Sequence, residues 1–264
     1  MLGSLLRLPG LKQLRASGRL NALLRLCHGS YWGMFPTREA ALAYRRPSAK
    51  VAYDDDRIVP INLDVFSRIH LFDWPLLFHL EQMIKRRALR RVTDFGGHVG
   101  VKYHAYRQAM QFPDDLLWQV VDVPAMCQEG RRRAADLPQL RFHENLDETL
   151  PADVLICSGS LQYVGAGLDE ILARSPAPPP RILLNKVAVT DEQDFFTLES
   201  FGIGRMPYQV MALPTLDALR ERCGYVLERR WELPDRNFTV QAPGGRQLVQ
   251  MIGEAWRYET SPER

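Results

Sequence analysis

The sequence predicts an α/β protein built on a mostly parallel β-sheet. Apolar runs of strand length alternate with segments of helical spacing from about residue 76 onward, which is the rhythm of βαβ units. A glycine-rich turn, Gly96-Gly97-His98-Val99-Gly100, directly follows the first of these runs. With 264 residues, 46% of them hydrophobic and 25% charged, the chain is long enough for one such domain with an extension.

Seven strands are expected, and the first five are expected to be parallel. The segments between those five are long enough for crossover helices, and a crossover joins parallel strands. The last two runs are joined through Pro234, Pro243 and Gly244-Gly245 without a helical segment, which predicts an antiparallel pair at the sheet edge. The expected strands are 91–95, 118–123, 140–142, 153–157, 181–187, 225–231 and 247–252, and the expected helices are 76–90, 101–111, 124–135, 167–174 and 214–223.

The first 75 residues differ from this pattern and are expected to form a helical extension and a cap or lid for the domain of residues 76–264. Leucines alternate with basic residues over 1–27, which favours one or two basic amphipathic helices broken near Pro9-Gly10. Two roles stay open for them: packing against the body, or reversible contact with a membrane surface or a partner. Residues 31–73 look irregular, apart from a short helix that Thr37 is placed to cap.

The composition of the chain indicates which classes of binding partner and which cellular compartment to expect. A formal net charge of +3 gives no reason to expect nucleic-acid binding. No apolar run reaches the roughly 18 residues needed to cross a bilayer, and residues 1–27 lack the features of a signal peptide. The four cysteines lie far apart without a C-x-x-C pair, which favours a reducing, cytoplasmic compartment. No metal-ligand spacing is present, so no metal is expected, and the oligomeric state stays open.

The turn after the first expected strand carries the strongest chemical signal. Gly96, Gly97 and Gly100 lie between that strand and a helical segment, the order found in nucleoside-cofactor sites. The dinucleotide fingerprint G-x-G-x-x-G, aligned on Gly97 and Gly100, would need glycine where Phe95 stands. An acid at the strand end instead suits S-adenosylmethionine, because Asp94 can face the cationic amino group of its methionine moiety.

Asp122 supplies a second acid at the end of the next expected strand. It follows the glycine turn at about the 20-residue distance expected of a βαβ nucleoside site, where a carboxylate can accept hydrogen bonds from both ribose hydroxyls. Val123, next to it, is expected to contact the cofactor as well. The alternative is structural: Asp94 caps the glycine turn, and Asp122 caps the helix that begins at Pro124.

The fourth expected strand runs into a polar loop, residues 158–164, at the same carboxyl edge of the sheet. Ligands of open α/β sheets bind at that edge. Ser158 and Leu161 are therefore expected to contact the cofactor, and Tyr163 is expected to lie where a transferred group meets its acceptor. The competing interpretation is that Leu161-Gln162-Tyr163 is the first turn of a packed helix.

Three segments together give a more specific resemblance. Tyr31-Trp32-Gly33-Met34-Phe35 with Glu39-Ala40, Asp94-Phe95-Gly96-Gly97, and Ser158-Gly159-Ser160-Leu161-Gln162-Tyr163 resemble a family of class I S-adenosylmethionine-dependent methyltransferases often associated with bacterial surface-polysaccharide gene clusters. The similarity covers about residues 30 to 255. It implies a Rossmann-like methyltransferase fold with strand order 3-2-1-4-5-7-6, and S-adenosyl-L-methionine as cofactor.

His98 departs from both the general pattern and the resembled family, which usually have glycine there. An imidazole near neutrality can take a proton from a hydroxyl, so His98 is a candidate catalytic residue beside Tyr163, and a candidate cofactor contact. A structural substitution is the competing interpretation. If the side chain blocks the pocket, the chain is a non-catalytic relative.

The expected activity is methyl transfer to a hydroxyl oxygen of a sugar, glycan or other small acceptor, in which positioning supplies much of the rate. The Trp32 segment and the loop expected over residues 190–209, with Phe195, Phe196 and Tyr208, are expected to form the acceptor wall or the packing of a lid. Two alternatives stay open. One is a binding or scaffold protein without turnover, and the weaker one is an NAD-dependent oxidoreductase.

Overall fold

Five parallel strands form the part of the sheet that the sequence predicted. The computed structural model describes residues 31–44, 67–200, 205–242 and 245–259, so the basic segment 1–27 lies outside the described residues. The central strand, β2, pairs in parallel with β3 and β5, and further parallel pairs join β3 to β4 and β5 to β6. These strands are β2 (Arg91–Phe95), β3 (Leu117–Val121), β4 (Leu140–His143), β5 (Val154–Ser158) and β6 (Arg181–Thr190).

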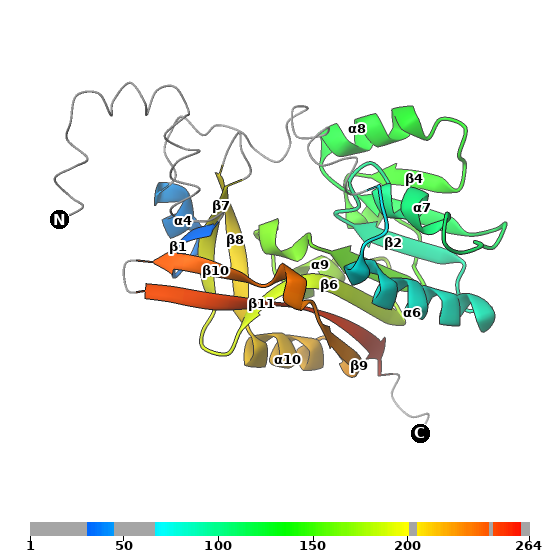
Figure 1. The fold of residues 1–264 in the computed structure, drawn as a ribbon. Helices are drawn as coiled ribbons and strands as arrows, with labels where there is room; N and C mark the ends of the chain where they lie inside the picture. Colours follow the sequence, from blue (N-terminus) through cyan, green and yellow to red (C-terminus); the bar gives the residue numbers. More distant parts are fainter. Residues whose placement is uncertain (1–30, 45–66, 201–204, 243–244, 260–264) are drawn as a thin grey trace.

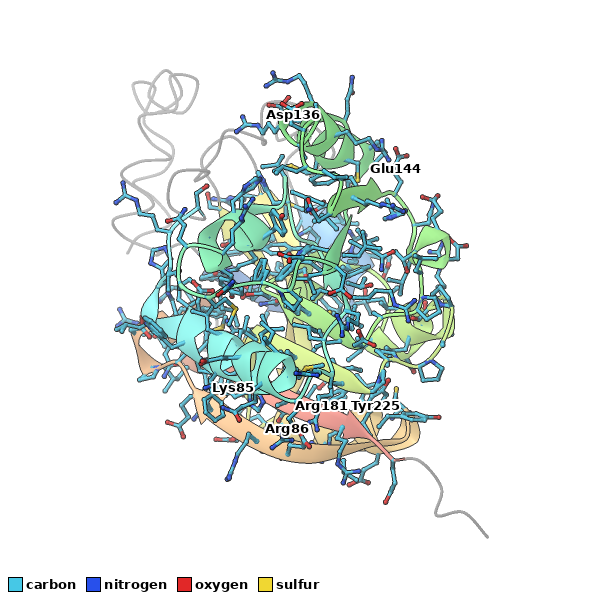
Figure 2. All side chains as sticks on the ribbon, turned by 90° about the vertical axis from the view of Figure 1, so that its right-hand side faces the viewer. Lys85, Arg86, Asp136, Glu144, Arg181 and Tyr225 are labelled. Atoms are coloured by element: carbon cyan, nitrogen blue, oxygen red, sulfur yellow. The ribbon has the colours of Figure 1, made fainter. Side chains whose placement is uncertain are left out.

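Helices cover both faces of these strands (Figure 1), because the strands are apolar on both sides. Successive residues of β5 show this: Ile156 packs in one core and Leu155 in the other, since neighbouring side chains of a strand point to opposite faces. Side chains fill the space on either side of the sheet (Figure 2). One face carries α6 (Trp74–Lys85), α7 (Val101–Tyr106) and α8 (Pro124–Arg133), and the other carries α9 (Leu168–Ala173) and α10 (Leu213–Arg222).

Two antiparallel strands extend the sheet beyond β6. The second part of β11 (Gly245–Tyr258) lies between β6 and β9 (Tyr225–Glu232) and is antiparallel to both. The strands joined by these pairings therefore run β4-β3-β2-β5-β6-β11-β9. The antiparallel relation of the last two expected strands is confirmed, but a further strand, β10 (Phe238–Ala242), lies between them in the sequence.

Four more strands were not predicted, so the expectation of seven strands was wrong: the described residues contain eleven. β8 (Arg205–Ala212) pairs with the end of β6, and β7 (Phe195–Ser200), β1 (Tyr31–Phe35) and β10 follow in order, returning to the first part of β11. Residues 190–209 are thus mainly a hairpin rather than a loop. Pro207 in β8 hid the pattern, because proline within a run argues against a strand.

Two local expectations can be compared directly with the structure. Thr37 caps α4 (Arg38–Tyr44), since its Oγ1 accepts the N–H of Ala40 at 3.1 Å. The helix expected over 76–90 begins earlier, at Trp74, and ends at Lys85, because Arg87 takes a left-handed backbone conformation with φ 57°. Within the described residues, no helix is both long and apolar enough to span a lipid bilayer.

Candidate functional site

A cavity of about 570 Å³ lies at the carboxyl edge of the parallel strands. The chain segments that leave β2, β3, β4 and β5 line it, together with residues of α4, α9 and β8. Because the carboxyl ends of parallel strands meet at one edge, this is the position where open α/β sheets bind ligands. The residues from the strand ends include Phe95 and Gly96, Val121 to Val123, Glu144 to Leu146, and Gly159, Ser160 and Tyr163.

The glycine turn brings backbone rather than side chains to the cavity. Gly96 lies on the wall with φ +71°, and a Cβ there would overlap the side chain of Ser160. Gly97 lies over Asp94, since a Cβ on Gly97 would come within 2.6 Å of Asp94 Oδ2. Gly100 is the N-cap of α7 and packs toward Leu140, away from the lining residues.

Asp94 is buried beneath this turn and is 1% exposed. Trp118 Nε1 donates a hydrogen bond to its Oδ2 at 3.2 Å. Burial raises the pKa of Asp94 to about 7, although the Trp118 hydrogen bond and the positive charge of Lys102 act in the opposite direction. A cation brought next to Asp94 would therefore favour its ionised form, which is the behaviour expected of a receptor for an ammonium group.

Asp122 lies on the cavity wall and also holds the glycine turn. Its Oδ2 accepts the backbone N–H of His98 at 2.7 Å, and its Oδ1 accepts the N–H of Val123 at 2.8 Å. Each carboxylate oxygen has a second lone pair. Asp122 can therefore accept hydrogen bonds from hydroxyl groups in the cavity while it keeps both backbone contacts, so ligand binding and capping are compatible in one residue.

His98 occupies the turn with its backbone in the left-handed region, φ 57°, and is 5% exposed. This conformation costs an L-residue about 1–2 kcal/mol, which explains why glycine is usual here. The imidazole is not among the residues that line the described cavity. Burial, and next the charge of Arg133, lower the pKa of His98 to about 4, so its ring is neutral near pH 7. Its predicted roles as base and cofactor contact remain predictions.

The loop after β5 lines the cavity with residues that lie next to the two expected contacts, Ser158 and Leu161, and not with those two residues themselves. Gly159 and Ser160 line the cavity, and Ser160 Oγ donates to the carbonyl of Phe95 at 2.7 Å, which joins the ends of β5 and β2. Ser158 is the last residue of β5, and its Oγ accepts a hydrogen bond from Asn185 Nδ2 at 3.5 Å. Leu161 packs in the core beneath α9.

Tyr163 lines the cavity and is bonded to a carboxylate from β7. Its hydroxyl donates to Glu199 Oε2 at 2.5 Å, and the hydroxyl of Tyr31 donates to Glu199 Oε1 at 3.0 Å. Burial raises the pKa of Glu199, while the two hydroxyl hydrogen bonds lower it. Glu199 pairs across the hairpin with Met206, which lines the cavity. Leu161–Tyr163 form a 3-10 helix of three residues that ends at Val164, so this segment is a single turn and not the start of a longer helix.

Several residues of the site were missed by sequence reasoning. Glu144, Asn145 and Leu146 follow β4 directly, so the carboxyl-edge argument that found Asp122 applies to them as well. Met206 and Glu199 belong to the hairpin that was expected to be a loop, and nothing near them in the sequence marked them. Of the expected acceptor wall, Phe195 and Tyr208 are buried in a hydrophobic core and Trp32 stacks on Tyr44 with ring centroids 4.7 Å apart.

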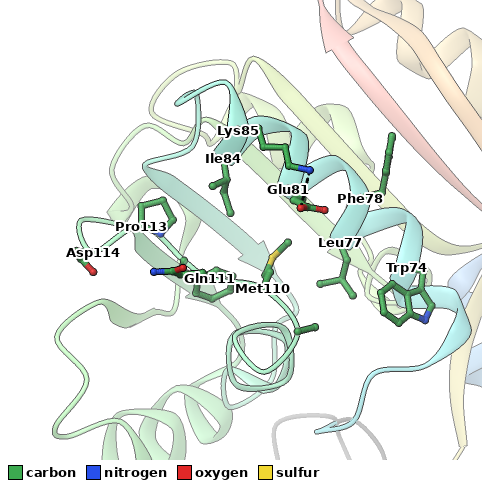
Figure 3. A pocket seen from close by; sticks show the side chains of 12 residues that line it. Trp74, Leu77, Phe78, Glu81, Ile84, Lys85, Met110, Gln111, Pro113 and Asp114 are labelled. Carbon is green, nitrogen blue, oxygen red and sulfur yellow. Dashed lines mark ion pairs between the residues drawn. The ribbon is translucent and has the colours of Figure 1, made fainter.

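A second cavity, of about 690 Å³, lies against α6 (Figure 3). Trp74, Leu77 and Phe78 form its apolar side, and residues 109–114 close the opposite side. Lys85 Nζ forms an ion pair with Glu81 at 2.9 Å, and both side chains are exposed to solvent. The charged side chains that line this second cavity, Glu81, Lys85 and Asp114, are all exposed, whereas the strand-end cavity has the buried Asp122 on its wall.

Neither a protein-family model nor a curated protein matches the sequence. Similar solved structures include the glycopeptide N-methyltransferase MtfA complexed with S-adenosylmethionine, with TM-score 0.48, 10% identity, and coverage of 69% of this chain and 94% of that chain. Human N-acetylserotonin methyltransferase in complex with S-adenosylmethionine matches with TM-score 0.48, 15% identity, and coverage of 79% and 58%. OxaC in complex with sinefungin and meleagrin matches with TM-score 0.44, 13% identity and 65% coverage of this chain, which spans 43% of OxaC.

Proposed function

We propose that this protein is an S-adenosylmethionine-dependent methyltransferase acting on a hydroxyl group of a small acceptor. The observation that carries the proposal is the composition of the cavity at the strand ends. Gly96 of the glycine turn and the carboxylate of Asp122 line it, and the buried carboxylate of Asp94 lies beneath the turn, against Gly97. The position of the cavity, at the carboxyl edge of parallel strands, adds support because cofactors of such sheets bind there.

The residues present fit the parts of this cofactor. The carboxylate of Asp122 lies on the cavity wall, where it can accept hydrogen bonds from the ribose hydroxyls. Val123, Leu146 and Ile171 supply apolar wall for a flat base. Asp94, beneath Gly97, is the acid for the amino group, and the missing Cβ of Gly97 leaves that carboxylate close to the turn surface.

S-adenosylmethionine supplies an electrophilic methyl group on a sulfonium sulfur. The chain has to orient the acceptor and, for a weakly acidic hydroxyl, receive its proton. Tyr163 and Glu199 form the pair we assign to that task. A proton from the acceptor oxygen would pass to the Tyr163 hydroxyl as the proton of Tyr163 passes to Glu199, whose raised pKa favours protonation.

A sugar or related polyhydroxylated molecule is the acceptor class we propose. Polar side chains in the cavity lining support this class: besides Tyr163, which is bonded to Glu199, Arg38 and Asn145 offer groups that hydrogen-bond to hydroxyls. His98 is not among the residues that line the described cavity, which supports a pocket that its imidazole leaves open.

Calorimetric titration with S-adenosylmethionine and S-adenosylhomocysteine tests the cofactor assignment, with NADH as the competing ligand. We expect both sulfur nucleosides to bind and NADH not to bind. Absence of binding by either nucleoside at millimolar concentration would overturn the proposal. Screening for S-adenosylhomocysteine release over sugars, phenols and amines then tests the acceptor class, and turnover confined to amines would contradict the hydroxyl assignment.

A further inference from the structure

Lys186 sits in a β-bulge near the carboxyl end of the parallel strands. Between two paired positions, β6 has two residues, Asn185 and Lys186, where β11 has Gly253 alone. Lys186 takes a left-handed backbone conformation, φ 55°, which L-residues rarely adopt. A bulge turns a side chain away from the regular alternation of its strand. The direction of the Lys186 side chain is therefore set by a distortion that glycine would accommodate more easily.

The bulge brings the lysine ammonium group to the wall of the cofactor cavity. A Cβ on Gly159 would lie 2.9 Å from Lys186 Cε and 3.0 Å from its Nζ, so the end of the side chain lies against Gly159. Gly159 lines the cavity and has φ +77°. The Lys186 side chain remains partly exposed, whereas Asn185 beside it is fully buried. Gly159 thus leaves the room that the ammonium group occupies.

Three cations surround the ring of Phe72, and Lys186 differs from the other two in its surroundings. Its Nζ lies 4.9 Å from the ring centroid, compared with 5.2 Å for Lys102 and 4.5 Å for the guanidinium of Arg236. Lys102 is held by a buried ion pair with Asp73. Arg236 is largely open to solvent. Lys186 is the cation whose side-chain end lies against Gly159 of the cavity wall.

The charges near Lys186 suit a ligand that carries both signs. Burial, Lys102 and Arg236 lower the pKa of Lys186 to about 7, against the opposite influence of Asp73 and Asp94. Asp94, in the same electrostatic neighbourhood, has its pKa raised, so each of the two groups gains from a partner of opposite charge. An α-amino acid end presents an ammonium and a carboxylate on one carbon, which matches an acid and a lysine at neighbouring positions.

We propose that Lys186 binds the carboxylate at the amino-acid end of the cofactor, while Asp94 receives its ammonium group. This assignment rests on the proposed function. In this role Lys186 selects cofactors that retain an intact amino-acid end. The left-handed bulge orients the Lys186 side chain for this contact, because in a regular β6 the side chain at position 186 would point in a different direction.

The test compares two ligands on the full chain by calorimetry. S-adenosylhomocysteine carries the amino-acid end, and 5′-methylthioadenosine lacks both its ammonium and its carboxylate. In Lys186→Met we expect S-adenosylhomocysteine to bind about tenfold or more weakly, because a charge-assisted contact is lost. We expect the affinity for 5′-methylthioadenosine to stay within about twofold, since no part of that ligand reaches Lys186.

Two further variants complete the design. Lys186→Gly removes the same ammonium group but suits the left-handed backbone, so it gives a folded protein even if the methionine variant does not fold. Lys85→Met is the matched control, because Lys85 is an exposed lysine of α6 outside the cofactor cavity. It should leave both affinities unchanged.

Each result has a distinct meaning. A selective loss of S-adenosylhomocysteine binding in either Lys186 variant supports the assignment. Wild-type affinity in both variants, or an equal loss for both ligands in the folded glycine variant, overturns it and leaves the cofactor proposal intact. Failure of the wild-type protein to bind S-adenosylhomocysteine at all overturns the proposed function and this assignment together.

Discussion

The carboxylate of Asp122 accepts the backbone N–H of His98 at 2.7 Å, so the end of β3 holds the glycine turn that follows β2. The same carboxylate accepts the N–H of Val123 and lies on the cavity wall. One acid therefore links the shape of the turn to the surface that we propose binds the ribose.

Replacing this acid gives the first prediction. Asp122→Ala leaves two backbone N–H groups without their acceptor and removes the hydroxyl acceptor, so S-adenosylhomocysteine binding is expected to weaken by about 1–3 kcal/mol. Calorimetry measures the binding, and urea denaturation measures the accompanying loss of stability. Asp136→Ala, at an exposed acid after α8, is the control. Unchanged affinity in folded Asp122→Ala would rule out the ribose role.

His98 makes folding stability sensitive to acid. The ordinary pKa of histidine is 6.5, and burial lowers that of His98 to about 4 in the folded protein. Below pH 6.5 the unfolded chain takes up a proton that the folded protein does not, so stability is lost as pH falls toward 4. His98→Gly removes this acid-induced loss of stability. When the pH is lowered from 7 to 5, the free energy of unfolding of the variant should therefore increase by about 2 kcal/mol relative to that of the wild type.

Denaturant titrations of both proteins at the two pH values measure that difference. The left-handed backbone at position 98 suits glycine, so the variant is expected to fold. A constant difference between variant and wild type across this range would show that His98 becomes protonated in the folded protein. The same variant should retain S-adenosylhomocysteine binding, because the imidazole is not among the cavity-lining residues.

The pKa values of Asp94 and Lys186 predict that cofactor affinity passes through a maximum as pH changes. Each has a pKa of about 7 in the folded protein, with Asp94 ionised above that pH and Lys186 protonated below it. Binding through both charges should therefore be strongest near pH 7. Calorimetric titrations from pH 5.5 to 8.5 measure this profile. In Asp94→Asn the affinity is expected to decline only at high pH, and in Lys186→Met it is expected to decline only at low pH.

The ligand 5′-methylthioadenosine provides the control for this profile, because it carries neither charge. Its affinity should vary little with pH in the wild-type protein. The charge assignment would be wrong if this ligand reproduced the same maximum, since the titrating groups would then act through the protein alone.

Tyr163→Phe tests the proton-accepting pair. The substitution removes the hydroxyl that joins the cavity to Glu199, so turnover with a hydroxyl acceptor is expected to fall by about 100-fold, the range of general acid–base contributions. S-adenosylhomocysteine affinity should not change. Tyr31→Phe is a matched control: it removes the other hydroxyl from Glu199, and Tyr31 is not among the lining residues. Equal losses in both variants would indicate a structural role for Glu199.

The local sequence pattern was sufficient to predict the strands of the parallel half of the sheet. Val154 to Cys157 form an unbroken apolar run because both faces of β5 are buried, and that composition is visible without knowledge of any partner strand. The glycine turn and Asp122 were recognisable for a related reason: strand, turn and helix are contiguous in the sequence, and the next acid follows at a regular distance.

The hairpin side of the site could not be predicted in this way. β1 pairs with β7 and β10, strands more than 150 residues away in the chain, so its identity as a strand depends on partners that the local sequence does not specify. Its five residues include Gly33, and β8 contains Pro207, both of which argue against strands when read alone.

The sequence by itself determined the α/β architecture, the parallel strands and the acids Asp94 and Asp122, because each depends on neighbours close along the chain. Only the tertiary structure decided that Glu199 meets Tyr163, that Lys186 reaches Gly159, and that Asp122 holds the backbone of His98. These relations depend on long-range pairing and on a bulge in β6. The register of distant strands sets them, and no periodicity within a single segment encodes that register.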